Sequence, residues 1–215
     1  TPLLGSPELN VAKARADIAE LARVSDVLFS RLRTDLTVNE SWTGENLEYY
    51  NRYREYASSM QEGVSRFLIE IAQQDIAEKT RDNISIMMRN IADFESISIG
   101  CANMAEIQAK AMKKKLFFAE DEVRLLAPYT QLVHDFLTFV RDRVGSPLSA
   151  VDLATATDFE NRVDASRAEL KKLARKRIKA GSDVKAELQF LDLIRHIEKI
   201  GDYAYSIAEN LREMK

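Results

Sequence analysis

The sequence is poor in cysteine, proline and glycine, and each shortage excludes a class of structure. Cys101 is the single cysteine, so an intramolecular disulfide and a thiolate zinc site are both excluded, and a reducing compartment is expected. The 215 residues include four prolines, none of them between Pro7 and Pro128 or after Pro147, which permits long helices. No apolar stretch approaches the roughly 20 residues of a membrane-spanning helix, and no signal peptide is visible. The chain begins at Thr1, so we expect either processing or a piece of a longer protein.

The sequence also lacks a large excess of either positive or negative charge. The chain has 31 Lys and Arg residues against 34 Asp and Glu, which leaves a net charge of −3. This balance gives no support to general nucleic-acid binding, and we expect no nucleic-acid partner. At 46% hydrophobic and 30% charged residues, the composition is typical of a soluble globular protein.

Apolar residues recur at helical spacing along most of the chain, and no segment shows the alternation of a β-strand. Ser6 is expected to cap the first helix, and this helix is expected to end at a break at residues 39–44. Gly181 is expected to terminate the fifth helix. Because the connections are short, sequential helices should run antiparallel. The sequence predicts an all-α protein of six long helices, the first beginning at Pro7 and the others spanning about residues 45–74, 80–115, 119–143, 150–179 and 183–215.

An internal repeat organises these helices. Residues 94–106 resemble residues 197–209 at an offset of 103, and this shift also places the first helix on the fourth and the second on the fifth. Such a long period indicates a duplicated three-helix unit rather than a solenoid. We therefore predict two tandem antiparallel three-helix bundles, residues 1–115 and 116–215, with residues 1–40 as a connecting amphipathic helix within the first.

Carboxylates follow the apolar faces of the last two predicted helices. Glu198 and Asp202 lie one turn apart on the sixth helix, in an acidic stripe that also includes Glu187 and Glu209. The fifth helix repeats the spacing with a second pair. Neighbouring helices could present the two pairs to each other, and like charges at such a seam repel unless protons or a cation intervene. The candidate metal ligands are Glu198, Asp202, Glu160 and Asp164.

Two interpretations of these carboxylates stay open. One is a site for a hard divalent or ferric metal ion, since carboxylate oxygens suit Mg²⁺, Ca²⁺, Mn²⁺ or Fe³⁺. A ferritin-like di-iron centre is disfavoured, because neither histidine has a glutamate three residues before it. The other interpretation is a solvated helix face whose charge is balanced by Arg167, Lys171, Arg195 and Lys199.

The sixth helix carries a family resemblance. Its sequence Glu198-Lys199-Ile200-Gly201-Asp202, followed by Ser206-Ile207-Ala208-Glu209, resembles the PhoU-domain signature E-R-I-G-D-H-x-x-N-I-A-E. The departures are lysine for arginine at 199, tyrosine for histidine at 203 and serine for asparagine at 206. The resemblance implies two tandem three-helix bundles over about 170 residues and metal clusters at the E-x-x-x-D pattern, here Glu198 and Asp202. The pair on the fifth helix is added from spacing alone.

The first repeat keeps less of this pattern. Ile99 stands where the aspartate belongs, and Ser98 replaces the glycine. The shift of 103 residues also places Ala57 opposite Glu160 and Gln61 opposite Asp164. We therefore expect at most one intact metal site, in the second bundle.

Thr1-Pro2 and the long Ala-rich helix after it resemble the segment that joins bacterial Na⁺/phosphate cotransporters to their C-terminal PhoU-like domain. The resemblance implies a non-catalytic domain that regulates sodium-coupled phosphate transport. It would be soluble itself, lie at the cytoplasmic side of the bacterial inner membrane, and partner the membrane domain of the same protein or a phosphate transporter.

Two rival functions are kept beside this interpretation. One is a free-standing phosphate-signalling adaptor that binds a phosphate transporter or a sensor kinase. The other is a carboxylate-metal helical enzyme, which lacks support because no histidine or proton-shuttling set accompanies the acids. A homodimer also stays open.

Basic residues gather at the ends of the third and fifth predicted helices. Cations there complement the helix dipoles and normally stay solvated. In an up-down bundle both helices end on the same side, which would create a basic end able to contact anionic lipid or a negatively charged partner. The two groups are Lys110, Lys113, Lys114 and Lys115, and Lys171, Lys172, Arg175, Lys176, Arg177 and Lys179.

Overall fold

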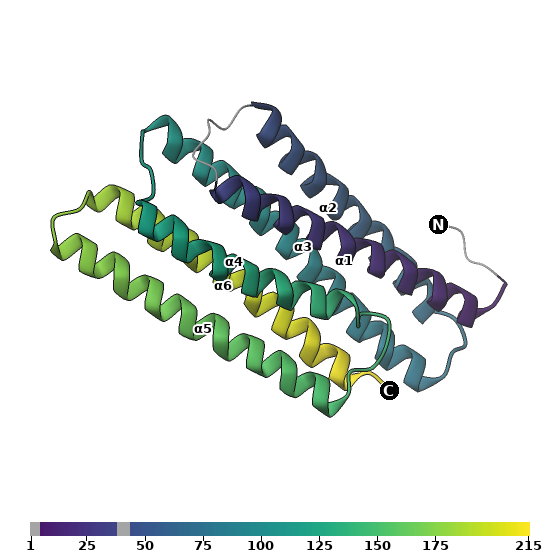
Figure 1. The fold of residues 1–215 in the computed structure, drawn as a ribbon. Coiled ribbons are helices and arrows are strands. Elements are labelled where there is room, and N and C mark those ends of the chain that lie inside the picture. The colour runs from purple at the N-terminus through teal and green to yellow at the C-terminus, as the bar shows by residue number, and fades with distance from the viewer. Residues whose placement is uncertain (1–4, 38–43) are drawn as a thin grey trace.

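The fold was analysed in a computed structural model that describes residues 5–37 and 44–215. Within these ranges the chain forms six α-helices and no strand, which confirms the all-α prediction. The second to sixth helices begin and end within two residues of the predicted positions. Thr1, Pro2 and most of the predicted break at residues 39–44 lie outside the described residues. The helices are α1 (Pro7–Thr37), α2 (Gly44–Ala72), α3 (Glu78–Lys113), α4 (Glu120–Arg141), α5 (Ala150–Lys179) and α6 (Val184–Glu213) (Figure 1).

Local capping explains several helix ends. The Ser6 hydroxyl accepts a hydrogen bond from the backbone N–H of Leu9 at 3.3 Å, so the predicted cap of α1 forms. Ser149 and Asp183 act in the same way at the starts of α5 and α6. Gly181 follows α5 with a φ of +92°, a conformation that favours glycine because it has no Cβ.

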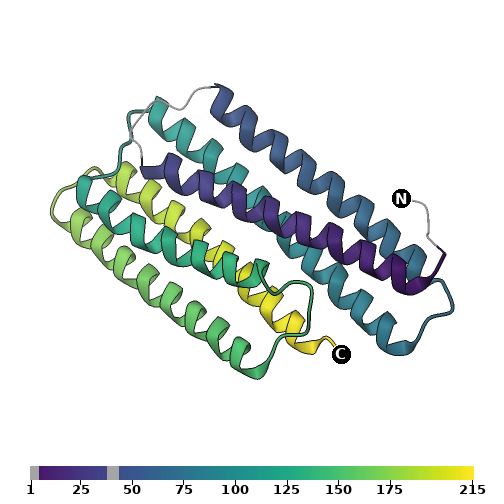
Figure 2. The ribbon, with the colours of Figure 1, turned by 45° about the vertical axis from the view of Figure 1, so that its right-hand side comes forward.

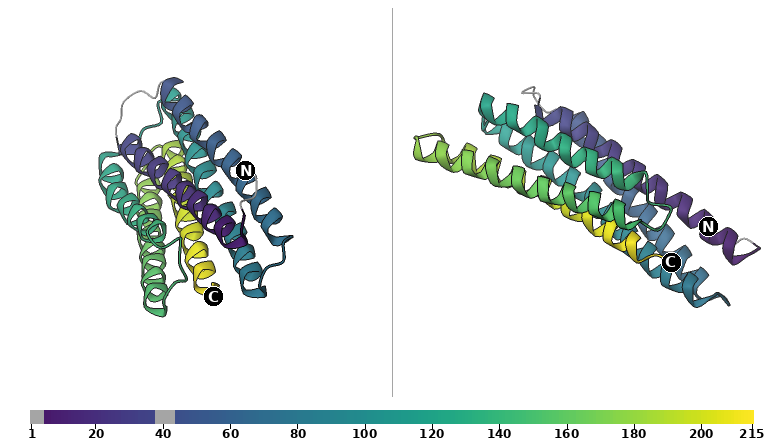
Figure 3. Two further views of the ribbon diagram at one scale, coloured as in Figure 1. Left: turned by 90° about the vertical axis from the view of Figure 1, so that its right-hand side faces the viewer. Right: turned by 60° about the horizontal axis from the view of Figure 1, so that its bottom comes forward.

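The six helices run up and down as two three-helix bundles lying side by side, α1–α3 and α4–α6 (Figure 1). The outer helices, α2 and α5, pack only on helices of their own bundle and lie at opposite edges of the molecule (Figure 2). The two bundles meet through α3 with α6 and α1 with α4. These are the pairs that the 103-residue repeat makes equivalent, and the whole body is elongated along the helices (Figure 3).

The seam between α3 and α6 combines apolar packing with polar pairs. The Asn210 side-chain amide donates to the Asn90 oxygen at 2.9 Å, and the Ser206 hydroxyl donates to Asp93 at 2.8 Å. Between these helices, a Cβ built on Gly100 would lie 3.9 Å from Ile200. This is an ordinary van der Waals distance, so the two central helices would also accommodate a methyl group at this position.

The hydrophobic core is continuous across both bundles. Large side chains from each half are fully buried in it, and Cys101 is buried among them. The division into domains at residues 115 and 116 stays a prediction. No helix within residues 5–37 and 44–215 has the length and hydrophobicity needed to cross a membrane.

A buried carboxylate links α1 to α4. Asp26 is 6% exposed and lies 3.1 Å from the His134 Nε2 atom, beside an ion pair with Arg141 and a 3.3 Å hydrogen bond from Thr138. Burial raises the pKa of Asp26, but the hydrogen bond and charge of His134 and the charge of Arg141 outweigh it. The pKa of Asp26 is therefore lowered, so its stabilising contribution is present at neutral pH and is lost as the pH falls through that value.

Asp26→Asn is expected to lower the free energy of unfolding by about 2 kcal/mol at pH 7, because a buried anion with three partners is removed. The matched control is Asp17→Asn on the same helix, where the carboxylate pairs with Lys13 at the surface. The control should change stability by less than about 0.5 kcal/mol. Urea unfolding measures both, and equal losses in the two variants would contradict the role assigned to Asp26.

Candidate functional site

The structure brings the four predicted carboxylates to one seam between α5 and α6. Glu160 and Asp164 lie on α5, and Glu198 and Asp202 lie on the α6 face that packs beside it. Glu160, Glu198 and Asp202 are half-buried, whereas Asp164 is exposed. We call these four residues the acidic cluster.

Close packing of the two helices brings the acidic cluster together. A Cβ built on Gly201 would lie 3.3 Å from the Val163 Cγ1 atom, and Val163 is only 1% exposed. A Cβ at position 201 would therefore fit only if Val163 shifted by a few tenths of an ångström. This explains physically why the E-x-x-G-D pattern places a glycine just before its aspartate.

Glu160 is the most perturbed member of the acidic cluster. Burial, followed by the charges of Asp202, Asp164 and Glu198, raises its pKa to about 7. A side-chain hydrogen bond with Asp202 contributes in the same direction, and the Glu160 Oε2 atom has no hydrogen-bond partner. A carboxyl group with a pKa of about 7 changes its charge close to neutral pH.

Two cations partly neutralise the acidic cluster. Arg167 forms an ion pair with Glu198, and the Lys199 ammonium lies 3.7 Å from the Asp202 Oδ2 atom. Burial still raises the pKa of Glu198, against the opposing hydrogen bond of Arg167. Burial likewise raises the pKa of Asp202, against the opposing charge of Lys199. The remaining repulsion among the four carboxylates acts mainly on Glu160, whose pKa is raised most.

Of the four cations expected to balance these acids, only two do so directly. Arg195 pairs instead with Asp192 at 2.8 Å, and Lys171 has no carboxylate within 4.0 Å among the described residues. Among those same residues, no group of three or more His, Cys, Asp or Glu side chains is arranged to hold a metal ion. Metal binding by Glu160, Asp164, Glu198 and Asp202 therefore stays a prediction.

Glu187 does not belong with Glu198 and Asp202, although all three share one angular stripe on α6. It lies three turns away and is 2% exposed, 2.8 Å from the Arg177 Nε atom. Arg177 also contacts Glu122 at 3.0 Å and Asp121 at 3.0 Å on α4. Burial, then the charge of Glu187, raises the pKa of Glu122 to about 7. Sequence reasoning missed this second cluster, because angular position on one helix carries no information about partners on another.

The equivalent position in the first bundle carries no gathered carboxylates. Ala57 is fully buried, and Gln61 donates to Ser65 on its own helix at 3.1 Å. Ile99 replaces the aspartate. The carboxylate seam is thus a feature of α5 and α6.

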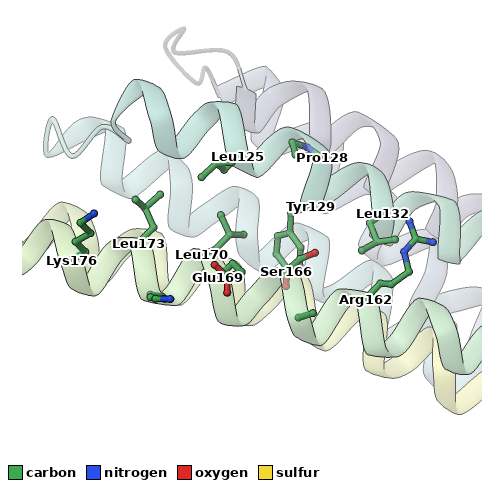
Figure 4. Close-up of a pocket in the computed structure, with 12 residues that line it drawn as sticks. Leu125, Pro128, Tyr129, Leu132, Arg162, Ser166, Glu169, Leu170, Leu173 and Lys176 are labelled. Carbon is green, nitrogen blue, oxygen red and sulfur yellow. The ribbon is translucent and has the colours of Figure 1, made fainter.

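A groove of about 740 Å³ lies between α4 and α5 (Figure 4). Its lining is mainly apolar, with leucines from both helices and Tyr129 extending from α4 toward α5. The Tyr129 hydroxyl donates to the Ile194 carbonyl of α6 at 3.0 Å. Burial, then the charge of Glu198, raises the pKa of Tyr129, so this groove-lining residue also feels the charge of the acidic cluster.

Comparison with solved structures gives close matches over the whole chain. PhoU from Pseudomonas aeruginosa superposes with a TM-score of 0.83 at 14% identity, covering 96% of this chain and 97% of that one. The chain has the PhoU fold. The phosphate transport system regulatory protein PhoU from Streptococcus pneumoniae matches with a TM-score of 0.81 at 17% identity, covering 96% and 95%. A putative PhoU-like phosphate regulatory protein from Shewanella oneidensis matches with a TM-score of 0.61 at 12% identity, covering 97% and 98%.

The family comparison locates the sequence similarity more narrowly. The PhoU domain model matches residues 150–211, which span α5 and nearly all of α6. These are the helices that carry the acidic cluster. Comparison with curated protein sequences gives no significant match.

The raised pKa of Glu160 predicts how stability depends on pH. Between about pH 4.3 and 7 the folded chain holds a proton that the unfolded chain has released, so stability falls as the pH rises through this window. Glu160→Gln should remove this loss. The free energy of unfolding should decrease less in the variant than in the original chain when the pH is raised from 5 to 8. The difference between the two decreases should be on the order of 1 kcal/mol.

Chemical unfolding at both pH values measures this difference. The matched control is Glu169→Gln on the exposed side of α5, which should keep the original pH dependence. The same change between pH 5 and pH 8 in all three proteins would refute the assignment to Glu160.

Proposed function

We propose that this chain is a non-catalytic PhoU-like domain that regulates phosphate uptake. The observation that carries the proposal is the coincidence of two features on α5 and α6, the PhoU domain match and the acidic cluster. The fold it shares with a phosphate transport system regulatory protein supports the same role. Its partner would be a phosphate transporter.

Regulation would proceed through helix packing. Protonation or charge neutralisation at Glu160 changes the repulsion between α5 and α6, which Gly201 and Val163 hold in close contact. Tyr129 lines the groove on α4 and α5, and its pKa is raised by the charges of Glu198, Asp164 and Asp202 at that seam. A change at the acidic cluster would thus alter a surface that a partner can contact, which is the requirement for coupling two sites.

We further propose that a divalent or ferric metal ion can replace the proton at the acidic cluster. The chemistry of the donors fits, because Glu160 has a free Oε2 atom and lies against Asp202, with two more carboxylates nearby. Arg167 and Lys199 oppose the ion by neutralising Glu198 and Asp202. When bound, the ion would supply positive charge between α5 and α6.

Metal content tests the acidic cluster directly. The purified chain should retain or take up one or more ions of Mg²⁺, Ca²⁺, Mn²⁺ or Fe³⁺, measured by elemental analysis and by the rise in Tm on adding each ion. Glu160→Gln combined with Asp202→Asn should abolish both effects. Glu209→Gln, an exposed change on α6, should leave them intact. No ion bound by the original chain, or equal binding by the double variant, would exclude the metal site.

The finer context we propose is the C-terminal domain of a Na⁺/phosphate cotransporter, at the cytoplasmic side of the bacterial inner membrane. The Thr1-Pro2 segment and the Ala-rich α1 support it by resemblance. A free-standing adaptor that binds a phosphate transporter or a sensor kinase fits the fold equally well.

Phosphate uptake in cells tests the function and separates these contexts. Removing the coding region for this chain should change the rate of radiolabelled phosphate uptake and its response to external phosphate. If the changed component requires sodium, the cotransporter context is supported, whereas a sodium-independent change supports the adaptor. Unchanged uptake at both high and low phosphate would exclude a regulatory role in transport.

A further inference from the structure

One end of the molecule collects exposed cations that have no anionic partner. Helices α3 and α5 both end there, and α6 begins there (Figure 1). We define the basic end by six exposed side chains, Lys113, Lys114, Lys115, Arg175, Lys176 and Lys179. Among the described residues, none of the six has a carboxylate within 4.0 Å, although ion pairs are frequent elsewhere on the surface.

The acids that could neutralise the basic end are committed to another cation. Asp121, Glu122 and Glu187 all contact Arg177, which points inward. The exposed acids at this end include Glu120, Asp183 and, at the start of α2, Glu45 and Glu48. The hollow beside α5, about 510 Å³, is lined by cationic side chains and a single alanine. This end therefore presents exposed cations that form no ion pair among the residues that the structure describes.

Large apolar side chains are exposed at the same end. Phe117 is 48% exposed, Val184 is 50% exposed and Leu188 is 55% exposed. Phe117 is held outward, because its neighbour Phe118 is buried and packs edge-on against Phe190 at 5.5 Å between ring centroids. A hydrogen bond from Gln189 to the Ile107 carbonyl at 3.5 Å joins the start of α6 to α3. The apolar and basic side chains therefore share one structured surface.

The opposite end is organised differently. It also exposes apolar residues, such as Val151 at 76%. Its cations, however, are interspersed with acids, and Lys215 pairs with Asp82 at 2.9 Å while Arg89 pairs with Glu213 at 2.7 Å. Exposed cations without an ion pair, such as Lys79 and Arg81, occur at this end too, but among the described residues the basic end gathers six of them beside Phe117 and Leu188.

We propose that the basic end binds the surface of an anionic lipid bilayer. The lysines and Arg175 would contact lipid headgroups, while Phe117 and Leu188 enter the boundary between headgroups and acyl chains. An anionic bilayer is favoured as the partner because its charge complements the cations of the basic end. In addition, each exposed apolar side chain that enters the bilayer boundary buries apolar surface. The binding does not depend on phosphate regulation and is measured without it.

Sedimentation with lipid vesicles tests the proposal. The purified chain should bind vesicles of phosphatidylglycerol and phosphatidylcholine at low salt, and should not bind phosphatidylcholine alone. Lys113→Gln with Lys114→Gln should weaken binding about twentyfold. The matched control, Lys79→Gln with Arg81→Gln, removes the same charge from the other end of α3 and should leave binding unchanged. Circular dichroism would verify that each variant remains folded.

A second pair of variants tests the apolar contact. Phe117→Ser should weaken binding to the anionic vesicles several-fold, whereas Val151→Ser at the opposite end should have no effect. Absence of binding to anionic vesicles at low salt would overturn the proposal. An acidic protein would then be the alternative partner for the basic end. Equal losses in the test and control variants would overturn the proposal as well. Unchanged binding by Phe117→Ser would overturn the insertion of apolar side chains.

Discussion

The antiparallel packing of α3 on α6 is the constraint on which the rest of the structure depends. Each three-helix bundle leaves apolar side chains of its central helix uncovered, and these two helices cover each other. Polar pairs such as Asn90 with Asn210 and Ser206 with Asp93 fix their register, since a shift by one turn would leave buried polar groups without partners. The register then places α1 against α4, where Asp26 finds its partners.

That arrangement gives α2 and α5 a different status from the four inner helices. Each packs on its own bundle alone and has an outer face open to solvent. On α5 this freedom has chemical consequences, because the helix carries half of the acidic cluster, one wall of the groove and half of the basic end. On α2 the corresponding positions are Ala57 and Gln61. The two bundles therefore share their packing, while their outer helices carry different chemistry.

The helices could be predicted because their signals are local. Proline spacing, Ser6 as a cap and Gly181 as a terminator each act within a few residues of the helix end they determine. Spacing along the sequence identifies the four residues of the acidic cluster. It does not identify the cations that neutralise them. Contacts between helices decide that question. The sequence groups Arg177 with the other cations at the end of α5, whereas its partners Glu122 and Glu187 lie on two other helices.

The match to PhoU structures at 14% and 17% identity shows that this fold is kept although most residues of the sequence differ. Helix packing tolerates such divergence provided that small residues remain where helices cross and apolar residues remain inside. Function must then be argued from side chains that packing does not need. Glu160 is such a residue, because burying a carboxylate among three others costs stability at neutral pH. Folding alone would favour a neutral side chain there, so the carboxylate is consistent with the proposal that this seam has a functional role.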